Sequence, residues 1–295
     1  MYLICMKGYY NMDLTSPRTI RNIQEQFGFT FKKGLGQNFL TARNILEEIV
    51  DAAEIESGVI EVGPGFGVLT SELAQNIDKV VTIEIDERLI DVLDYTLAEY
   101  DNVKIINEDI LKLDLKKVID DEFNGEKVSI AANLPYYITT PIITKLLEEK
   151  LPIKNIVVMV QKEVAERMSA KPSTKDYGAI TVLCQYYTEP SIVANVPASL
   201  FVPPPKVDSA VLKLKVLDKP SVEVKDEGVF FRVVKAAFSQ RRKTLLNCLS
   251  ANFPIPKDEI STLLESIGIA PSRRGETLSL EEFANIADTL LQKIK

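Results

Sequence analysis

The feature that most constrains the fold is an alternation, from Val59 onward, of short β-branched runs with longer segments of helical periodicity. Five such runs follow one another, at residues 59–62, 80–85, 103–107, 128–132 and 156–160. Strands separated by helical crossovers lie parallel in one sheet, because the crossover returns the chain to the edge where the strand began. The alternation therefore predicts an α/β fold with a doubly wound, Rossmann-like sheet.

Two further β-branched runs indicate a different ending to the sheet. Residues 191–196 and 210–216 lie too close together for a crossover helix, so we expect an antiparallel hairpin at the sheet edge. After Lys219 and Pro220, helical periodicity returns in three segments, at residues 229–249, 257–267 and 280–294. These segments predict a small all-helical C-terminal domain.

These patterns divide the chain into three parts. We expect an N-terminal extension with a lead-in helix at 1–30, the sheet domain at 31–218 and the helical domain at 219–295. Met12 precedes a plausible natural start, so we expect residues 1–11 to be dispensable.

The composition excludes several kinds of chemistry. The chain of 295 residues has no histidine, which removes histidine general bases and histidine-bound metals. Its three cysteines are scattered without metal-ligand spacing, so we expect neither a disulfide nor a metal site. The longest apolar runs are far below the roughly 18 residues of a membrane span. We therefore expect a cytoplasmic protein without a membrane partner, whose chemistry depends on positioning.

The net charge of −7 conceals a basic region. Residues 219–295 carry twelve basic and ten acidic side chains, so the acidic excess lies in the rest of the chain. Between Gly228 and Lys257 there is no acid at all. Such a region favours a nucleic-acid partner, although a solvated helix face with an apolar stripe produces the same pattern.

The tetrapeptide Asn133-Leu134-Pro135-Tyr136 follows the fourth strand and has the parts that an adenine amino group needs. Asn133 offers one hydrogen-bond acceptor for this poor nucleophile. Pro135 biases Leu134 to an extended backbone, which would aim the Leu134 carbonyl as a second acceptor. Tyr136 could stack on a base swung out of its helix. A strand that ends in a proline turn accounts for the same residues.

A glycine-rich turn and two acids follow the first three strands. Gly63, Gly65 and Gly67 have the spacing G-x-G-x-G, whereas the dinucleotide fingerprint is G-x-G-x-x-G and opens on a pyrophosphate. The difference favours a ligand without phosphates. Glu84 ends the second strand, where acids accept hydrogen bonds from ribose hydroxyls, and Asp109 after the third could accept from an adenine amino group.

This order of a glycine loop, two acids and Asn-Leu-Pro-Tyr resembles the S-adenosylmethionine-dependent amino methyltransferases. Three more motifs make the resemblance specific: KGLGQNFL at 33–40, FVPPPKVDS at 201–209 and FSQRRKTL at 238–245. With them, nearly the whole chain resembles the KsgA-type ribosomal RNA adenine N6,N6-dimethyltransferases. The resemblance implies a class I methyltransferase sheet domain followed by an RNA-binding helical domain.

The resemblance also implies S-adenosylmethionine as cofactor and assigns roles to individual positions. The implied cofactor-binding residues are Gln37, Asn38, Leu40, Gly63, Gly65, Glu84, Ile85, Asp109, Ile110 and Asn133. The implied residues of the reaction centre are Asn133, Leu134, Pro135, Tyr136 and Phe201. Phe201 would stack opposite Tyr136 with the target adenine between the rings; the alternative for Phe201 is a plain core aromatic. We expect RNA-binding cations at Lys32, Lys33, Lys206, Arg241, Arg242 and Lys243.

The reaction implied by the resemblance is dimethylation of N6 on two adjacent adenosines in the 3′-terminal hairpin loop of 16S rRNA, within the assembling small subunit. In-line attack on an activated sulfonium methyl depends on orientation and hydrogen bonding, so neither a general base nor a metal is required. We expect a monomer.

Three alternatives share parts of this pattern. An Erm-type enzyme would methylate a 23S rRNA adenosine with the same fold, cofactor and chemistry. A non-catalytic RNA-binding assembly factor would keep the fold alone, which the intact tetrapeptide and glycine loop disfavour. A DNA amino methyltransferase is disfavoured by the helical tail and by Leu134 in the tetrapeptide.

Overall fold

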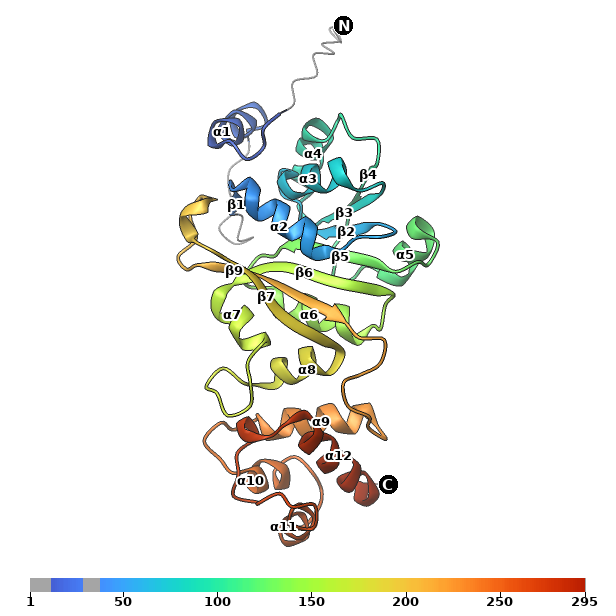
Figure 1. Cartoon of the computed structure of the whole chain (residues 1–295), viewed down its shortest axis with the longest axis vertical. Helices are drawn as coiled ribbons and strands as arrows, with labels where there is room; N and C mark the ends of the chain where they lie inside the picture. Colours follow the sequence, from blue (N-terminus) through green and yellow to red (C-terminus); the bar gives the residue numbers. More distant parts are fainter. Residues whose placement is uncertain (1–11, 29–37, 295) are drawn as a thin grey trace, which may run out of the picture. The chain divides into compact units, whose positions relative to one another are not determined.

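The computed structural model describes residues 12–28 and 38–294, and Figure 1 shows the chain. The chain forms two compact units. The first holds the chain as far as Lys162 together with Val193–Lys213, and the second holds Glu163–Ile192 and the chain from Leu214 onward. The segment Glu163–Ile192 thus groups with the C-terminal helices, although the sequence pattern placed it with the sheet domain.

A seven-stranded sheet has the order β4-β3-β2-β5-β6-β9-β7. Its strands are β2 (Val59–Val62), β3 (Val80–Glu84), β4 (Val103–Asn107), β5 (Val128–Asn133), β6 (Ile153–Gln161), β7 (Thr188–Val196) and β9 (Ser209–Val216). The strands from β2 to β6 pair in parallel, as the alternation predicted. The last two strands, β9 and β7, are neighbours at one edge, where we expected the hairpin. The predicted Rossmann-like α/β class is confirmed.

A short second sheet was not predicted. It consists of β1 (Phe39–Leu40) and β8 (Phe201–Val202), which pair antiparallel with Leu40 opposite Phe201. A strand of two residues is too short to show the alternation of apolar and polar side chains, so sequence pattern alone cannot reveal such a pair. It joins the start of the sheet domain to the proline-rich motif.

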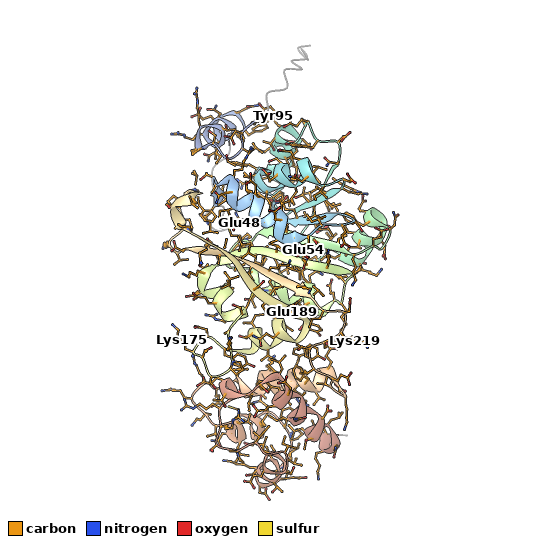
Figure 2. All side chains as sticks on the ribbon, in the orientation of Figure 1. Glu48, Glu54, Tyr95, Lys175, Glu189 and Lys219 are labelled. Carbon is orange, nitrogen blue, oxygen red and sulfur yellow. The ribbon has the colours of Figure 1, made fainter. Side chains whose placement is uncertain are left out.

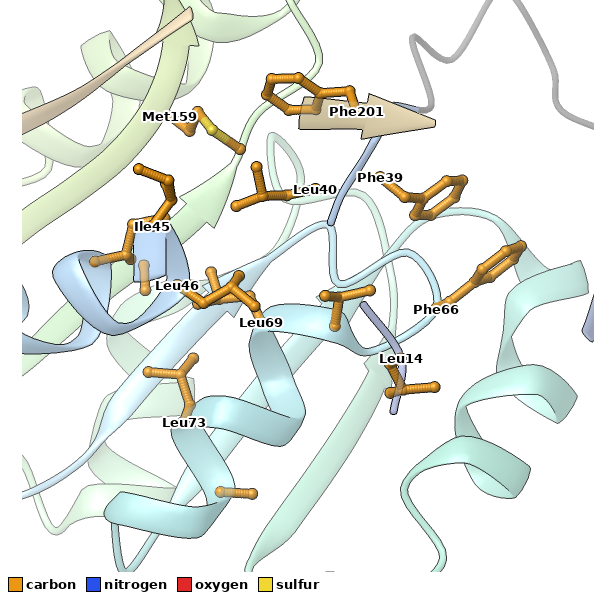
Figure 3. Close-up of a cluster of buried hydrophobic side chains, with 14 of the residues drawn as sticks. Leu14, Phe39, Leu40, Ile45, Leu46, Phe66, Leu69, Leu73, Met159 and Phe201 are labelled. Carbon is orange, nitrogen blue, oxygen red and sulfur yellow. The ribbon is translucent and has the colours of Figure 1, made fainter. Parts of the chain in front are cut away.

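The helices of the first unit lie between its strands along the chain, except for the first helix, which precedes them. They are α1 (Pro17–Gln26), α2 (Arg43–Ala53), α3 (Val68–Asn76), α4 (Ile90–Thr96), α5 (Leu115–Phe123) and α6 (Thr139–Glu148), with short 3-10 turns at Glu87–Leu89 and Ala198–Leu200. Helix α2 packs on α3 and against β5 and β6. A cluster of buried side chains from α1, α2, α3 and neighbouring strands, part of which Figure 3 shows, forms one part of the core of this unit.

The second unit is helical apart from the ends of β7 and β9. Its helices are α7 (Lys162–Met168), α8 (Ala179–Tyr187), α9 (Glu227–Ala237), α10 (Leu245–Ser250), α11 (Lys257–Ser266) and α12 (Leu280–Ile294), with a 3-10 turn at Gly275–Thr277. Four aromatic rings, Tyr186, Tyr187, Phe230 and Phe231, pack on one another with centroids 4.8–5.8 Å apart. Charged side chains such as Lys175 and Lys219 extend outward from this unit (Figure 2).

The single helix expected at 229–249 is wrong, because the structure has α9 and α10 separated by a turn. Thr244 caps α10 by accepting a hydrogen bond from the Asn247 N–H (3.4 Å). The preceding turn is closed by a bond from the Lys243 N–H to the Gln240 carbonyl (3.0 Å). A capping threonine inside an apolar period marks a helix start, and that signal was overlooked.

Candidate active site

One pocket of the first unit lies at the carboxyl ends of β2, β3, β4 and β5. It gathers residues that the sequence analysis had chosen separately, namely Asn38, Leu40, Gly63, Gly65, Glu84, Ile85, Asp109, Ile110, Asn133 and Pro135. The parallel strands explain this convergence, because their carboxyl ends meet at the topological switch point of the sheet. Of the expected cofactor-binding residues, Gln37 lies outside the described residues.

The glycine loop after β2 provides open space on one side of the pocket. Gly63 has a φ of +71°, and a Cβ placed on it would meet nothing within 4 Å. Gly65 has a φ of +60°, and its Cβ would lie 2.7 Å from the ring of Phe39. The left-handed backbone and the close ring both favour glycine here. A ligand can therefore approach the main chain at Gly63.

Glu84 is a buried carboxylate that lines the pocket at the end of β3. Its Oε1 accepts from the Asp86 N–H (2.8 Å), and its Oε2 accepts from the Gly65 N–H (3.4 Å). Burial raises the pKa of Glu84, although these two N–H groups oppose the shift. The side chain is thus held against the glycine loop with acceptor capacity left for a ligand hydroxyl.

A second acid, Glu61, lines the same pocket and was missed by the sequence analysis. It is 1% exposed, and its Oε2 accepts from the Thr70 hydroxyl at 2.5 Å. Burial raises the pKa of Glu61 to about 8; the Thr70 bond lowers it, and the nearby Glu84 raises it. A carboxyl among the β-branched residues of a buried strand costs free energy to bury, and such groups often mark functional sites, so the position of Glu61 in the strand was the available signal.

Asp109 and Ile110 follow β4 and line the pocket with Ile85. The Asp109 carboxylate accepts from the Leu111 N–H at 3.0 Å, which orients it in a tight turn. Ile85 is 54% exposed although it lines a pocket. Ile85 thus offers apolar surface to a ligand beside the polar groups of the pocket.

Asn133 ends β5 with its amide held in one orientation. Its Nδ2 donates to the Asn38 carbonyl at 3.0 Å, so Oδ1 is the end left to accept a hydrogen bond. The next residue, Leu134, is buried and donates its N–H to the Met159 carbonyl (3.1 Å). Within the described part of the chain, no group donates to the Leu134 carbonyl, whereas the Pro135 carbonyl accepts from Ile138 and Thr139.

The two predicted stacking rings lie outside the lining of this pocket. Tyr136 is partly buried, and its hydroxyl is 2.7 Å from the Ser209 hydroxyl. Phe201 is 3% exposed and packs in the hydrophobic cluster beside Leu40 and Met159 (Figure 3). Among the described residues, the rings of Tyr136 and Phe201 make no mutual contact. The exposed Tyr137 lines the pocket instead, although the sequence analysis had given it no role in the site.

The predicted RNA-binding cations belong to different parts of the chain. Lys32 and Lys33 lie outside the described residues, and Lys206 is exposed in the first unit. The exposed Arg241, Arg242 and Lys243 form the turn between α9 and α10 in the second unit.

Arg241 differs from Arg242 and Lys243 because its side chain has partners within the protein. Its Nη2 donates to the Lys175 carbonyl at 2.5 Å, and its Nε lies 3.8 Å from a Glu276 carboxylate oxygen. Within residues 12–28 and 38–294, Arg242 and Lys243 form no ion pair. These two cations are available to an outside partner.

The described residues contain no group of three acidic or cysteine side chains that could hold a metal ion. In the same part of the chain, no helix is long and apolar enough to cross a membrane.

Residues 28–292 match the family model described as "Ribosomal RNA adenine dimethylase". A protein of Bacillus mycoides named "Ribosomal RNA small subunit methyltransferase A" is 54% identical over 285 residues, which are 95% of this chain and 98% of the relative. A protein of the same name from Bacillus anthracis matches over the same extent with the same identity.

Two solved structures are also similar. A dimethyladenosine transferase from Plasmodium falciparum superposes with a TM-score of 0.72 and 29% identity, covering 86% of this chain and 98% of that one. The 23S rRNA methyltransferase ErmE superposes with a TM-score of 0.65 and 28% identity, covering 86% of this chain and all of that one.

Proposed function

This chain belongs to the ribosomal RNA adenine dimethylase family and is an rRNA adenine dimethyltransferase, and we propose that its substrate is 16S rRNA within the assembling small ribosomal subunit. Its targets are two adjacent adenosines in the 3′-terminal hairpin loop, and its methyl donor is S-adenosylmethionine. The relatives named small subunit methyltransferases support the choice of RNA.

The residues of the pocket fit S-adenosylmethionine. The space that a Cβ would occupy at Gly63 is open to a ligand, and the buried Glu84 can accept hydrogen bonds from ribose hydroxyls. Asp109, which lines the same pocket as Ile85 and Ile110, would accept a hydrogen bond from the adenine amino group. When bound, the cofactor supplies a methyl group activated by a sulfonium.

The observation that carries the proposal is the fixed amide of Asn133. Because Nδ2 of Asn133 donates to the Asn38 carbonyl, Oδ1 can accept a hydrogen bond from one hydrogen of the target N6. The Leu134 carbonyl can accept the other. Both bonds favour a pyramidal nitrogen whose lone pair is withdrawn from the ring, so they strengthen as the reaction proceeds and lower its barrier. Once methylated, the nitrogen is acidic, and its proton passes to water.

The proposal is tested by mass spectrometry of rRNA nucleosides from a strain that lacks this gene, with and without the protein restored. We expect N6,N6-dimethyladenosine in 16S rRNA only when the wild-type chain is present. Mapping to 23S rRNA would favour the chemistry of the ErmE-like structure instead. Its absence from both RNAs would overturn the proposal.

A further inference from the structure

The hydrogen bond between Tyr136 and Ser209 joins two motifs that lie 73 positions apart. Tyr136 belongs to the tetrapeptide after β5, and Ser209 begins β9. The two oxygens are 2.7 Å apart, and Ser209 is completely buried. Burial raises the pKa of the Tyr136 phenol, while the bond to Ser209 acts in the opposite direction. The phenol therefore stays protonated at neutral pH and can take part in this bond.

Hydrogen bonds of the preceding residue, Asp208, hold Ser209 in place. The preceding Asp208 accepts the Lys162 N–H on its carbonyl (3.0 Å), which ties it to the end of β6. Its carboxylate accepts the Ala198 N–H (2.9 Å), which ties it to the turn that leads into Phe201. The Asp208-Ser209 dipeptide thus holds both segments that carry the predicted stacking rings.

The bond does more than satisfy a surface hydroxyl, because Tyr136 is partly buried and Ser209 is completely buried. A completely buried serine hydroxyl costs free energy unless it is bonded, and here its partner is the far end of an aromatic ring. A bond at the para position fixes where the far end of the ring lies, since it restrains the χ1 torsion, and the in-plane geometry of a phenol hydrogen bond then favours one orientation of the ring.

We infer that Ser209 is a positioning residue for the target base, which it serves by fixing the ring of Tyr136 as a stacking surface. The inference rests on the proposed function, because it requires an adenine to stack on Tyr136. Ser209 itself touches neither the base nor the cofactor in this scheme.

The test uses the full-length protein with Ser209→Ala, Tyr136→Phe and the double variant. The substrate is small ribosomal subunits from the strain that lacks the gene. Each single variant should lower kcat/KM for the subunits by about two- to tenfold, the range of one neutral hydrogen bond. The double variant should be no slower than the slower single variant, because both changes remove the same bond. Affinity for S-adenosylmethionine should be unchanged.

Ser129→Ala is the matched control. Ser129 is equally buried in the first unit, and its hydroxyl donates to the Ala53 carbonyl at 2.7 Å, away from the pocket. This variant should lose stability without a change in kcat/KM. Ser209→Thr keeps the hydroxyl and should restore most of the rate if the variant folds.

The outcomes separate this inference from the proposed function. A wild-type protein that does not methylate small subunits contradicts the proposed function. An active wild type with unchanged rates in Ser209→Ala and Tyr136→Phe overturns the role of Ser209. Independent, multiplying losses in the double variant would also overturn it, because they would show that the two hydroxyls do not act through one bond.

Discussion

The two compact units bury different kinds of side chain. Two of the carboxyl groups that line the pocket of the first unit, those of Glu61 and Glu84, are buried. The core of the second is apolar and aromatic, while Arg242 and Lys243 remain exposed on its surface. Buried polar groups that packing does not require indicate a site, whereas an ordinary core with exposed cations indicates a scaffold that presents charge. Changes to the two units should therefore affect different measurements.

The largest effect should follow from Phe230→Ala, which removes a completely buried ring from the aromatic cluster of the second unit. Loss of packing and the resulting cavity should lower the free energy of unfolding by about 3–5 kcal/mol. Denaturant titration measures this change. Lys235→Ala, on the same helix but exposed, is the control and should stay within about 0.5 kcal/mol. A small loss for Phe230→Ala would mean that the second unit does not depend on its aromatic core.

Asn133→Ala in the first unit should act on rate rather than on stability. Loss of an acceptor that strengthens in the transition state should slow single-turnover methylation by about 100- to 1,000-fold, while much of the RNA affinity remains. Asn102→Ala is the matched control for this substitution. The Asn102 amide also donates to main-chain carbonyls, those of Ala74 and Ile77, but it lies outside the pocket. Near wild-type turnover in Asn133→Ala would contradict the role of this amide.

The buried acid Glu61 should make stability depend on pH. Its pKa of about 8 in the folded chain exceeds its ordinary value of 4.5, so between these values the folded state binds more protons than the unfolded state. The stabilising contribution is therefore complete below about pH 4.5 and is lost as the pH rises through about 8.

The isosteric variant Glu61→Gln tests this sign, because its side chain cannot ionise. The free energy of unfolding of the variant should lack this decline. Near pH 8 it should exceed that of the wild type by at least about 1 kcal/mol, since each pH unit between the two pKa values changes the free energy of unfolding by up to about 1.4 kcal/mol. Thermal unfolding from pH 5 to pH 8 measures the difference. Parallel curves for the two proteins would show that Glu61 does not titrate in this range.

The smallest effect should follow from neutralising the free cations of the second unit. Arg242→Ala with Lys243→Ala should weaken RNA binding by a few fold per contact and reduce the salt dependence by about one unit of slope each. Cofactor affinity and stability should not change. Arg241→Ala should in addition lower stability, because this side chain bonds the Lys175 carbonyl. An unchanged salt slope for the double variant would show that these cations do not meet phosphate.

Much of the site could be predicted because it depends on where strands end. Gly63, Glu84, Asp109 and Asn133 each lie at or just after the end of a strand that periodicity alone revealed, and parallel strands bring their ends to one edge. Glu61 and Tyr137 were missed for opposite reasons. Glu61 lies within a strand pattern, where an acid reads as an interruption, and Tyr137 has an exposed side chain whose place at the pocket depends on the turn after Asn133.

The residues alone establish the α/β class, the positions of the parallel strands along the chain and the set of side chains at their ends. These features follow from local periodicity and from the direction that a crossover imposes on the chain, whereas the order of the strands in the sheet comes from the structure. Only the tertiary structure decides which end of the Asn133 amide accepts, that Ser209 holds Tyr136, and that Phe201 packs beside Leu40. Those contacts join positions 95, 73 and 161 residues apart, and no local pattern encodes a pairing over such distances.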